Sequence, residues 1–104
     1  MNQLPAVIHL NVGGKLFATK LETLRKEEYS LLAVMFNGRN KLSKDKDGCY
    51  FIDRSGNYFD HILNYLRDSS YLPPSDIMTA VINEARYYNL CDYVHSMEQC
   101  MQLI

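Results

Sequence analysis

Two glycines at positions 13 and 14 separate two segments in which apolar and polar side chains alternate. In residues 7–12 one face of the alternation carries Ile8, Leu10 and Val12. A period of two is typical of a half-buried strand. Residues 15–20 resume the alternation, and consecutive glycines can adopt the positive φ angles that a two-residue hairpin turn requires. The sequence therefore predicts a tight antiparallel hairpin near the start of the chain.

After residue 20 the apolar residues recur mostly at helical spacing. Ser30 is placed to cap a nearly all-apolar helix, which Asn37-Gly38 ends. Residues 49–53 interrupt the helices with a short aromatic strand. The predicted helices cover residues 23–26, residues 31–36, a segment that opens at Ser55-Gly56-Asn57, a segment from Ser75 or Asp76 to Asn89, and a last segment from about Asp92 to Leu103. We therefore expect a single α+β domain over residues 1–104, with an N-terminal β-hairpin, a short third strand and about five helices.

Charge and composition narrow the class of partner. The 104 residues include eleven Lys and Arg and twelve Asp and Glu, for a net charge of −1, so no long-range field attracts nucleic-acid phosphates or anionic lipids. The longest apolar run, residues 31–36, is far too short to span a membrane. Three cysteines cannot all pair within one chain, which favours a reducing compartment. We expect a cytoplasmic protein that binds no nucleic acid and does not insert into a membrane.

No motif predicts catalysis or a cofactor. Gly13-Gly14-Lys15 lacks the earlier glycine and the following Ser or Thr of a phosphate-binding loop. Asp60 and His61 are neighbours on a predicted helix, so their side chains point apart. Cys91 and His95 are one helical turn apart, but no close cysteine pair accompanies them, and core thiols with a surface histidine are the simpler interpretation. We therefore expect no enzyme activity, cofactor, metal or small-molecule substrate.

The polar run that follows the third predicted strand has two interpretations. Asp53-Arg54-Ser55-Gly56 leads directly into a predicted helix, so Asp53 or Ser55 can be a local cap and Arg54 a solvated neighbour. Alternatively, Asp53 and Arg54 meet a complementary pair on a neighbouring subunit, because heterologous ring interfaces are often polar. The residues alone leave both interpretations open.

Several motifs, taken together and in order, resemble the potassium-channel-tetramerisation-domain (KCTD) family of BTB/POZ proteins. They extend over most of the chain, from about Val7 to Tyr93. They are Leu-Asn-Val-Gly-Gly-Lys-Leu-Phe at 10–17, Thr-Leu-Arg at 23–25, Met-Phe-Asn-Gly-Arg at 35–39, Tyr-Phe-Ile-Asp-Arg at 50–54, Ile-Leu-Asn-Tyr-Leu-Arg at 62–67 and Glu-Ala-Arg-Tyr-Tyr at 84–88. More distantly, the chain resembles the tetramerisation domain of voltage-gated potassium channels.

The resemblance implies a small BTB/POZ fold of the channel-tetramerisation type that closes into rings of identical subunits, with pentamers favoured and tetramers possible. It implies ring contacts through Arg39, Asp53 and Arg54. It also implies a substrate adaptor for cullin-3 ubiquitin ligases, in which the ligase scaffold binds at Met35, Phe36, Asn37, Arg39, Tyr71 and Leu72. The alternative is an oligomerisation or channel-assembly module without ligase contact. The adjacent cysteine pair through which one class of channel domains shares zinc is absent from this sequence, so that zinc site is not expected.

Phe36 is the residue on which these alternatives differ most. It lies at the end of a predicted helix, directly before Asn37 and Gly38. A large apolar side chain at such a place can face solvent and anchor a partner. It can equally pack into the core of the domain itself. The adaptor hypothesis favours an exposed Phe36.

Overall fold

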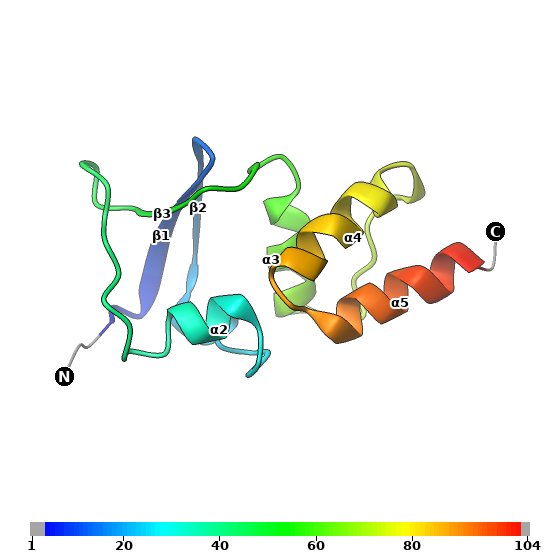
Figure 1. The fold of residues 1–104 in the computed structure, drawn as a ribbon, viewed down its shortest axis with the longest axis horizontal. Helices are drawn as coiled ribbons and strands as arrows, with labels where there is room; N and C mark the ends of the chain where they lie inside the picture. The colour runs from blue at the N-terminus through cyan, green and yellow to red at the C-terminus, as the bar shows by residue number, and fades with distance from the viewer. Residues whose placement is uncertain (1–3, 103–104) are drawn as a thin grey trace.

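The computed structural model of the chain describes residues 4–102. Its sheet has three strands, β1 (Val7–Val12), β2 (Lys15–Lys20) and β3 (Tyr50–Ile52), in the order β2-β1-β3. β2 pairs antiparallel with one side of β1, and β3 pairs parallel with the other side of β1 (Figure 1). The predicted hairpin is confirmed, because Gly13 and Gly14 have φ angles of 58° and 101° and form a tight turn between Val12 and Lys15.

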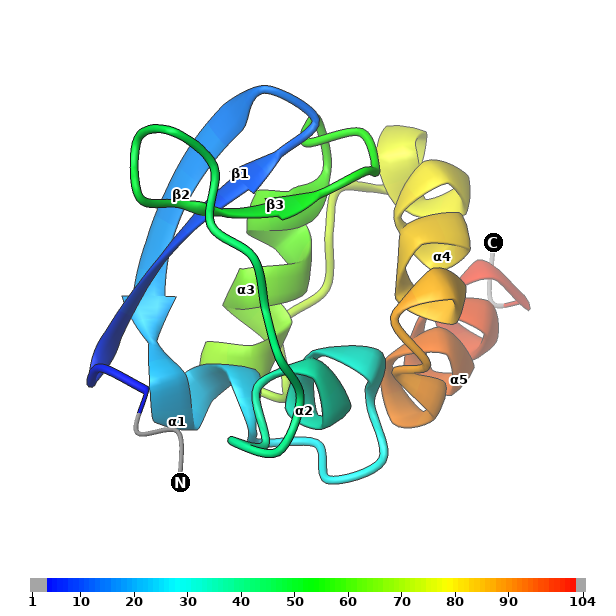
Figure 2. The ribbon, with the colours of Figure 1, turned by 60° about the vertical axis from the view of Figure 1, so that its left-hand side comes forward.

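Five α-helices fill the rest of the described chain. Their bounds are α1 (Leu21–Leu24), α2 (Leu31–Met35), α3 (Phe59–Arg67), α4 (Met78–Tyr87), which follows a single 3₁₀ turn η1 (Ser75–Ile77), and α5 (Cys91–Gln102). Figure 2 shows α3 behind the sheet, with α1 and α2 below and α4 and α5 to the side. The α+β fold with a hairpin, a short third strand and five helices is as predicted.

Two predicted helix starts are wrong. The segment Ser55-Gly56-Asn57 is a turn, in which the Ser55 hydroxyl accepts the Asn57 N–H at 3.3 Å, and α3 begins only at Phe59. Neither Ser75 nor Asp76 caps the next helix, because both lie within the 3₁₀ turn and Pro74 precedes it with φ −56°. The proline ring presets the φ angle and supports the start of a helix without a side-chain cap. By contrast, the predicted cap at Ser30 is confirmed, since its hydroxyl accepts the Ala33 N–H at 3.2 Å.

α4 ends at Tyr87, two residues before the predicted end at Asn89, and the chain then turns into α5. Asn89 has a φ of 59°, in the left-handed region that asparagine tolerates better than most residues. The Leu90 N–H donates to the Ala85 carbonyl at 2.9 Å, and the Asn89 N–H donates to the Arg86 carbonyl at 3.0 Å. These two bonds form a Schellman motif. α5 begins immediately afterwards, at Cys91, and packs against α4. The predicted contribution of Leu103 and Ile104 to α5 lies outside the described residues.

One continuous core joins the inner face of the sheet to the helices. Phe17 of β2 contacts Phe59 of α3 edge to face, with ring centroids 5.1 Å apart. Tyr65 and Tyr93 stack in parallel at 4.2 Å between α3 and α5. Burial raises the pKa of both of these tyrosine hydroxyls. Among residues 4–102 no helix is both long and apolar enough to cross a membrane.

Candidate interaction surfaces

The outer face of the sheet carries exposed apolar side chains. Asn11 of β1 is in register with Leu16 of β2 on one side and with Phe51 of β3 on the other. Leu16 is 70% exposed and Phe51 is 51% exposed. Val7, at the start of β1, adds a third exposed apolar side chain. We call Val7, Leu16 and Phe51 the outer-sheet patch. Exposed apolar side chains grouped on one sheet face are typical of a surface that binds another protein.

Close backbone contacts fix the segment after β3 against the hairpin turn. The Gly13 N–H donates to the Ile52 carbonyl at 3.0 Å. A Cβ atom on Gly13 would lie 2.2 Å from the Arg54 carbonyl oxygen, and one on Gly56 would lie 2.4 Å from the Val12 carbonyl oxygen. Only glycine fits at either position without a shift of backbone. The Asp53-Arg54 pair is therefore held at the tip of the hairpin.

Arg54 turns back onto its own chain. Its guanidinium donates to both carboxylate oxygens of Glu84 on α4, at 2.6 and 3.3 Å. It also lies over the ring of Tyr87, 4.2 Å from the ring centroid. Of the two interpretations of this run, the solvated neighbour does not describe Arg54, because Glu84 and Tyr87 contact its side chain. Asp53 is exposed and makes no hydrogen bond or ion pair within the described chain.

Arg39 lies apart from this pair. It is exposed in the segment after α2, where its backbone N–H donates to the Asn37 side-chain oxygen at 2.8 Å. In both views the end of α2 and the end of β3 are on opposite sides of the molecule (Figures 1 and 2). The three residues expected at the ring interface therefore belong to two separate surfaces of one subunit.

The expectation that Phe36 faces solvent is wrong. Its side chain is fully buried and meets Tyr50 edge to face, with ring centroids 5.4 Å apart. α2 ends at Met35, so Phe36 is the C-cap residue, and its φ of −104° and ψ of 28° leave the helical path. The Phe36 carbonyl accepts the Arg25 Nε–H at 2.6 Å. In this conformation the ring has no surface to offer a partner.

The remaining predicted partner residues lie on two distant surfaces. Met35 is half-buried and Asn37 is exposed at the end of α2. Tyr71 and Leu72 lie in the segment between α3 and α4, on the far side of α3 from α2 in Figure 1. The Tyr71 hydroxyl is 2.6 Å from Nδ1 of His61, which holds the segment against α3, and Leu72 is 43% exposed. A partner that contacts all these residues would have to reach around the domain.

A comparison with protein-family models identifies the fold. The model described as "BTB/POZ domain" matches residues 8–100, nearly the whole chain. The chain belongs to the BTB/POZ domain family. BTB/POZ domains are protein–protein interaction modules, so the exposed surfaces of this domain are the candidate functional sites.

The similar curated proteins include two from the predicted KCTD group. FH protein interacting protein FIP2 of Arabidopsis thaliana is 44% identical over 92 residues, 86% of this chain. BTB/POZ domain-containing protein KCTD14 of Homo sapiens is 40% identical over 100 residues, 96% of the chain. BTB/POZ domain-containing protein KCTD21 of Mus musculus is 39% identical over 94 residues, 88% of the chain. The match to this chain covers 31%, 38% and 36% of the length of these relatives, respectively. The resemblance to the KCTD family is confirmed.

Sequence reasoning did not single out the outer-sheet patch. The signal was present, because Tyr50 and Ile52 are buried and Phe51 between them is exposed, as strand alternation requires. What the sequence could not supply was the register that places Phe51 and Leu16 on either side of Asn11. Within residues 4–102 no three metal-ligating side chains come together in this BTB/POZ domain.

Proposed function

We propose that this BTB/POZ domain assembles with copies of itself into a closed ring, with a pentamer favoured and a tetramer possible. The observation that carries the proposal is the outer-sheet patch, where Leu16 and Phe51 leave apolar surface exposed on both sides of Asn11. Burying such surface against another subunit is favourable by about 25 cal/mol per Å². The neighbouring Asp53, exposed and unpaired within the described chain, adds a polar contact at the edge of this patch.

The distribution of charge supports a head-to-tail arrangement. Residues 4–50, which form the hairpin, α1 and α2, include eight Lys and Arg but only five Asp and Glu. Residues 51–102, which include α3, α4 and α5, have three Lys and Arg but seven Asp and Glu. The two halves lie at opposite ends of the long axis of the domain (Figure 1). A contact between unlike ends pairs opposite charges, and repeated head-to-tail contacts generate a ring when the rotation closes.

Native mass spectrometry of the purified chain tests the assembly. We expect one closed species of four or five subunits. Replacing Leu16 and Phe51 together by serine removes the apolar surface and should give monomers. Tyr29→Ser is the matched control, since Tyr29 is 81% exposed in the segment between α1 and α2, away from the patch. Assembly that survives the double substitution, or is lost equally in the control, would place the interface elsewhere.

We further propose that the assembled domain acts as a substrate adaptor for a cullin-3 ubiquitin ligase. This step rests on the resemblance to the KCTD family, with Met35, Asn37 and Arg39 at the end of α2 as the contact surface. The buried Phe36 cannot contribute its ring. A pure oligomerisation or channel-assembly module without ligase contact is the alternative, and the burial of Phe36 is the observation that favours it.

Calorimetric titration with the N-terminal region of cullin-3 separates these two functions. For an adaptor we expect binding that Arg39→Glu weakens about tenfold or more, which corresponds to about 1.4 kcal/mol. Leu72→Asp tests the distant surface in the same way. If the wild-type ring does not bind, the module is an oligomeriser only. If Leu72→Asp alone weakens binding, the contact surface is the segment between α3 and α4.

A further inference from the structure

β2 is a free edge of the sheet, because β1 lies between β2 and β3. In a two-residue hairpin the pair next to the turn, Val12 and Lys15, shares backbone hydrogen bonds, and bonded and non-bonded pairs then alternate along the strands. By this alternation the N–H and C=O groups of Leu16 and Ala18 point away from β1. These groups form an open row of donors and acceptors of the kind that another strand can pair with.

Only one of these four groups has a hydrogen-bond partner among residues 4–102. Nη2 of Arg67, on the last turn of α3, donates to the Ala18 carbonyl at 3.4 Å. This bond is long and exposed, so it is easily exchanged. α1 begins directly after β2 at Leu21 and limits the open edge to the strand itself.

The charges along this edge disfavour a second copy of the same strand. An antiparallel β2–β2 pair would set Lys15 of one copy opposite Lys20 of the other, and like charges directly opposite each other destabilise a strand pair. Lysines on an edge strand guard against such self-pairing. An acidic strand meets no such repulsion.

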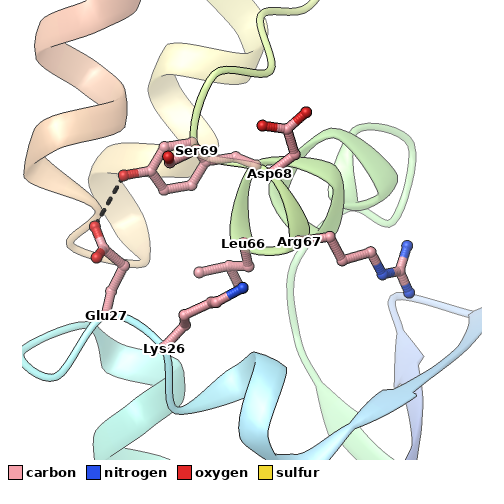
Figure 3. Close-up of a pocket in the computed structure, with 7 residues that line it drawn as sticks. Lys26, Glu27, Leu66, Arg67, Asp68 and Ser69 are labelled. Atoms are coloured by element: carbon pink, nitrogen blue, oxygen red, sulfur yellow. Dashed lines mark hydrogen bonds between the residues drawn. The ribbon is translucent and has the colours of Figure 1, made fainter.

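A cavity beside the edge contains two cations that an acidic side chain can reach. It has a volume of about 420 Å³ and lies between the end of α3 and the segment after α1 (Figure 3). Its two carboxylates are already bonded within the chain: Glu27 accepts the Tyr65 hydroxyl at 2.9 Å, and Asp68 accepts the Ser70 hydroxyl at 2.7 Å. The cations of its lining, Lys26 and Arg67, form no ion pair with any described residue.

We propose that the β2 edge binds an extended acidic segment of a partner protein as a fourth strand of the sheet. The backbone of the segment pairs with Leu16 and Ala18. One of its carboxylates takes the Arg67 guanidinium from the Ala18 carbonyl and reaches Lys26 in the neighbouring cavity. This mode is β-strand addition, in which main-chain bonds provide affinity and side-chain contacts provide specificity. The inference does not depend on ring assembly.

A blocked peptide of alternating valine and glutamate tests the site, with its valine–lysine counterpart as the charge control. We expect the acidic peptide to bind and to slow hydrogen exchange at the Leu16 and Ala18 amides. Ala18→Pro should weaken binding about tenfold or more, because it removes an outward-pointing donor while the bonds to β1 stay in place. Ala18→Val keeps the N–H and is the matched control. Lys26→Glu with Arg67→Glu, both on the surface, should abolish the preference for the acidic peptide.

Three results would overturn the proposal. Equal binding of the acidic and basic peptides would remove the charge argument. Undiminished binding of an acidic peptide that is N-methylated at every residue, and so lacks all backbone donors, would exclude strand addition. Slow exchange at Leu16 and Ala18 in the peptide-free assembly would mean that a neighbouring subunit already covers the edge, a result compatible with the ring itself.

Discussion

The carboxylate of Glu84 is joined to the guanidinium of Arg54 by two hydrogen bonds, and this pair ties the end of β3 to α4. Glu84 is the more buried partner, with its side chain 12% exposed against 32% for Arg54. A carboxylate in that position depends on its cation, since an unpaired buried charge is costly. The contact therefore lies within a single chain, and Asp53 is the member of the motif that the described chain leaves exposed.

Removing Arg54 should destabilise the folded domain. We expect Arg54→Ala to lower the free energy of unfolding by about 2 kcal/mol, because it leaves Glu84 without its partner. Adding Glu84→Gln to this variant should recover part of the loss. Urea denaturation at one fixed chain concentration measures both effects. An unchanged unfolding free energy in Arg54→Ala would show that the pair does not contribute to the stability of the domain.

Phe36 should behave as a core residue. Phe36→Ala should lower the free energy of unfolding by about 3–5 kcal/mol, because it opens a cavity beside Tyr50. Phe36→Leu keeps most of the volume and should cost about 1.5 kcal/mol or less. Thermal denaturation of the two variants distinguishes a core role of Phe36 from a surface role. At a surface position both substitutions would change the free energy of unfolding by less than about 0.5 kcal/mol.

The hairpin turn offers a comparison between adjacent glycines. Both Gly13 and Gly14 have positive φ angles, so alanine at either position costs about 1–2 kcal/mol in backbone strain. At Gly13 the new methyl group would also collide with the Arg54 carbonyl, whereas nothing lies within 4 Å at Gly14. Gly13→Ala should therefore be clearly the less stable variant in chemical denaturation. If Gly13→Ala and Gly14→Ala were equally stable, the segment after β3 would be able to move away from the new methyl group without loss of stability.

Asp45 should give the domain part of its sensitivity to acid. The Cys49 N–H at 2.9 Å, and then the Asn11 side-chain amide at 3.1 Å, hold the pKa of Asp45 below its ordinary value of 3.8. The ionised carboxylate therefore stabilises the fold fully above that value, and this stabilisation is lost as the pH falls through the lower, folded pKa.

Asp45→Asn should lower the free energy of unfolding near neutral pH. Below that range, the free energy of unfolding should then fall less steeply with pH than in the wild type. The neighbouring Asp47→Asn, at an exposed position whose side chain accepts no hydrogen bond within the described chain, is the control. Denaturation midpoints measured across the acid range check the prediction. A profile of Asp45→Asn with the same steepness as the wild type would contradict it.

The local elements of the fold could be predicted from the sequence because their causes are local. Alternation and the glycine pair determine the hairpin, and the Ser30 hydroxyl caps α2 three residues away. The left-handed turn at Asn89, just after α4, depends on neighbouring residues in the same way. Helix starts were missed where a rigid proline or a turn replaced a side-chain cap, at Pro74 and at Ser55.

The surfaces were harder to predict because they depend on contacts distant in sequence. The partner of Arg54 is Glu84, 30 residues further along the chain, and no periodicity indicates that contact. A nearly all-apolar helix such as α2 does not reveal which way its last residue turns, so the direction of Phe36 could not be predicted. The outer-sheet patch arises from three strands, one of which joins the hairpin in parallel from residue 50 onward.

We propose that this BTB/POZ domain assembles through unlike faces into a closed ring. Sedimentation velocity of the purified chain over a wide range of concentrations tests it most directly. We expect a single species of four or five times the chain mass whose mass stays constant as the concentration rises, because a ring has no free ends. A monomer at every concentration would contradict self-assembly, and a mass that rises without limit would contradict closure.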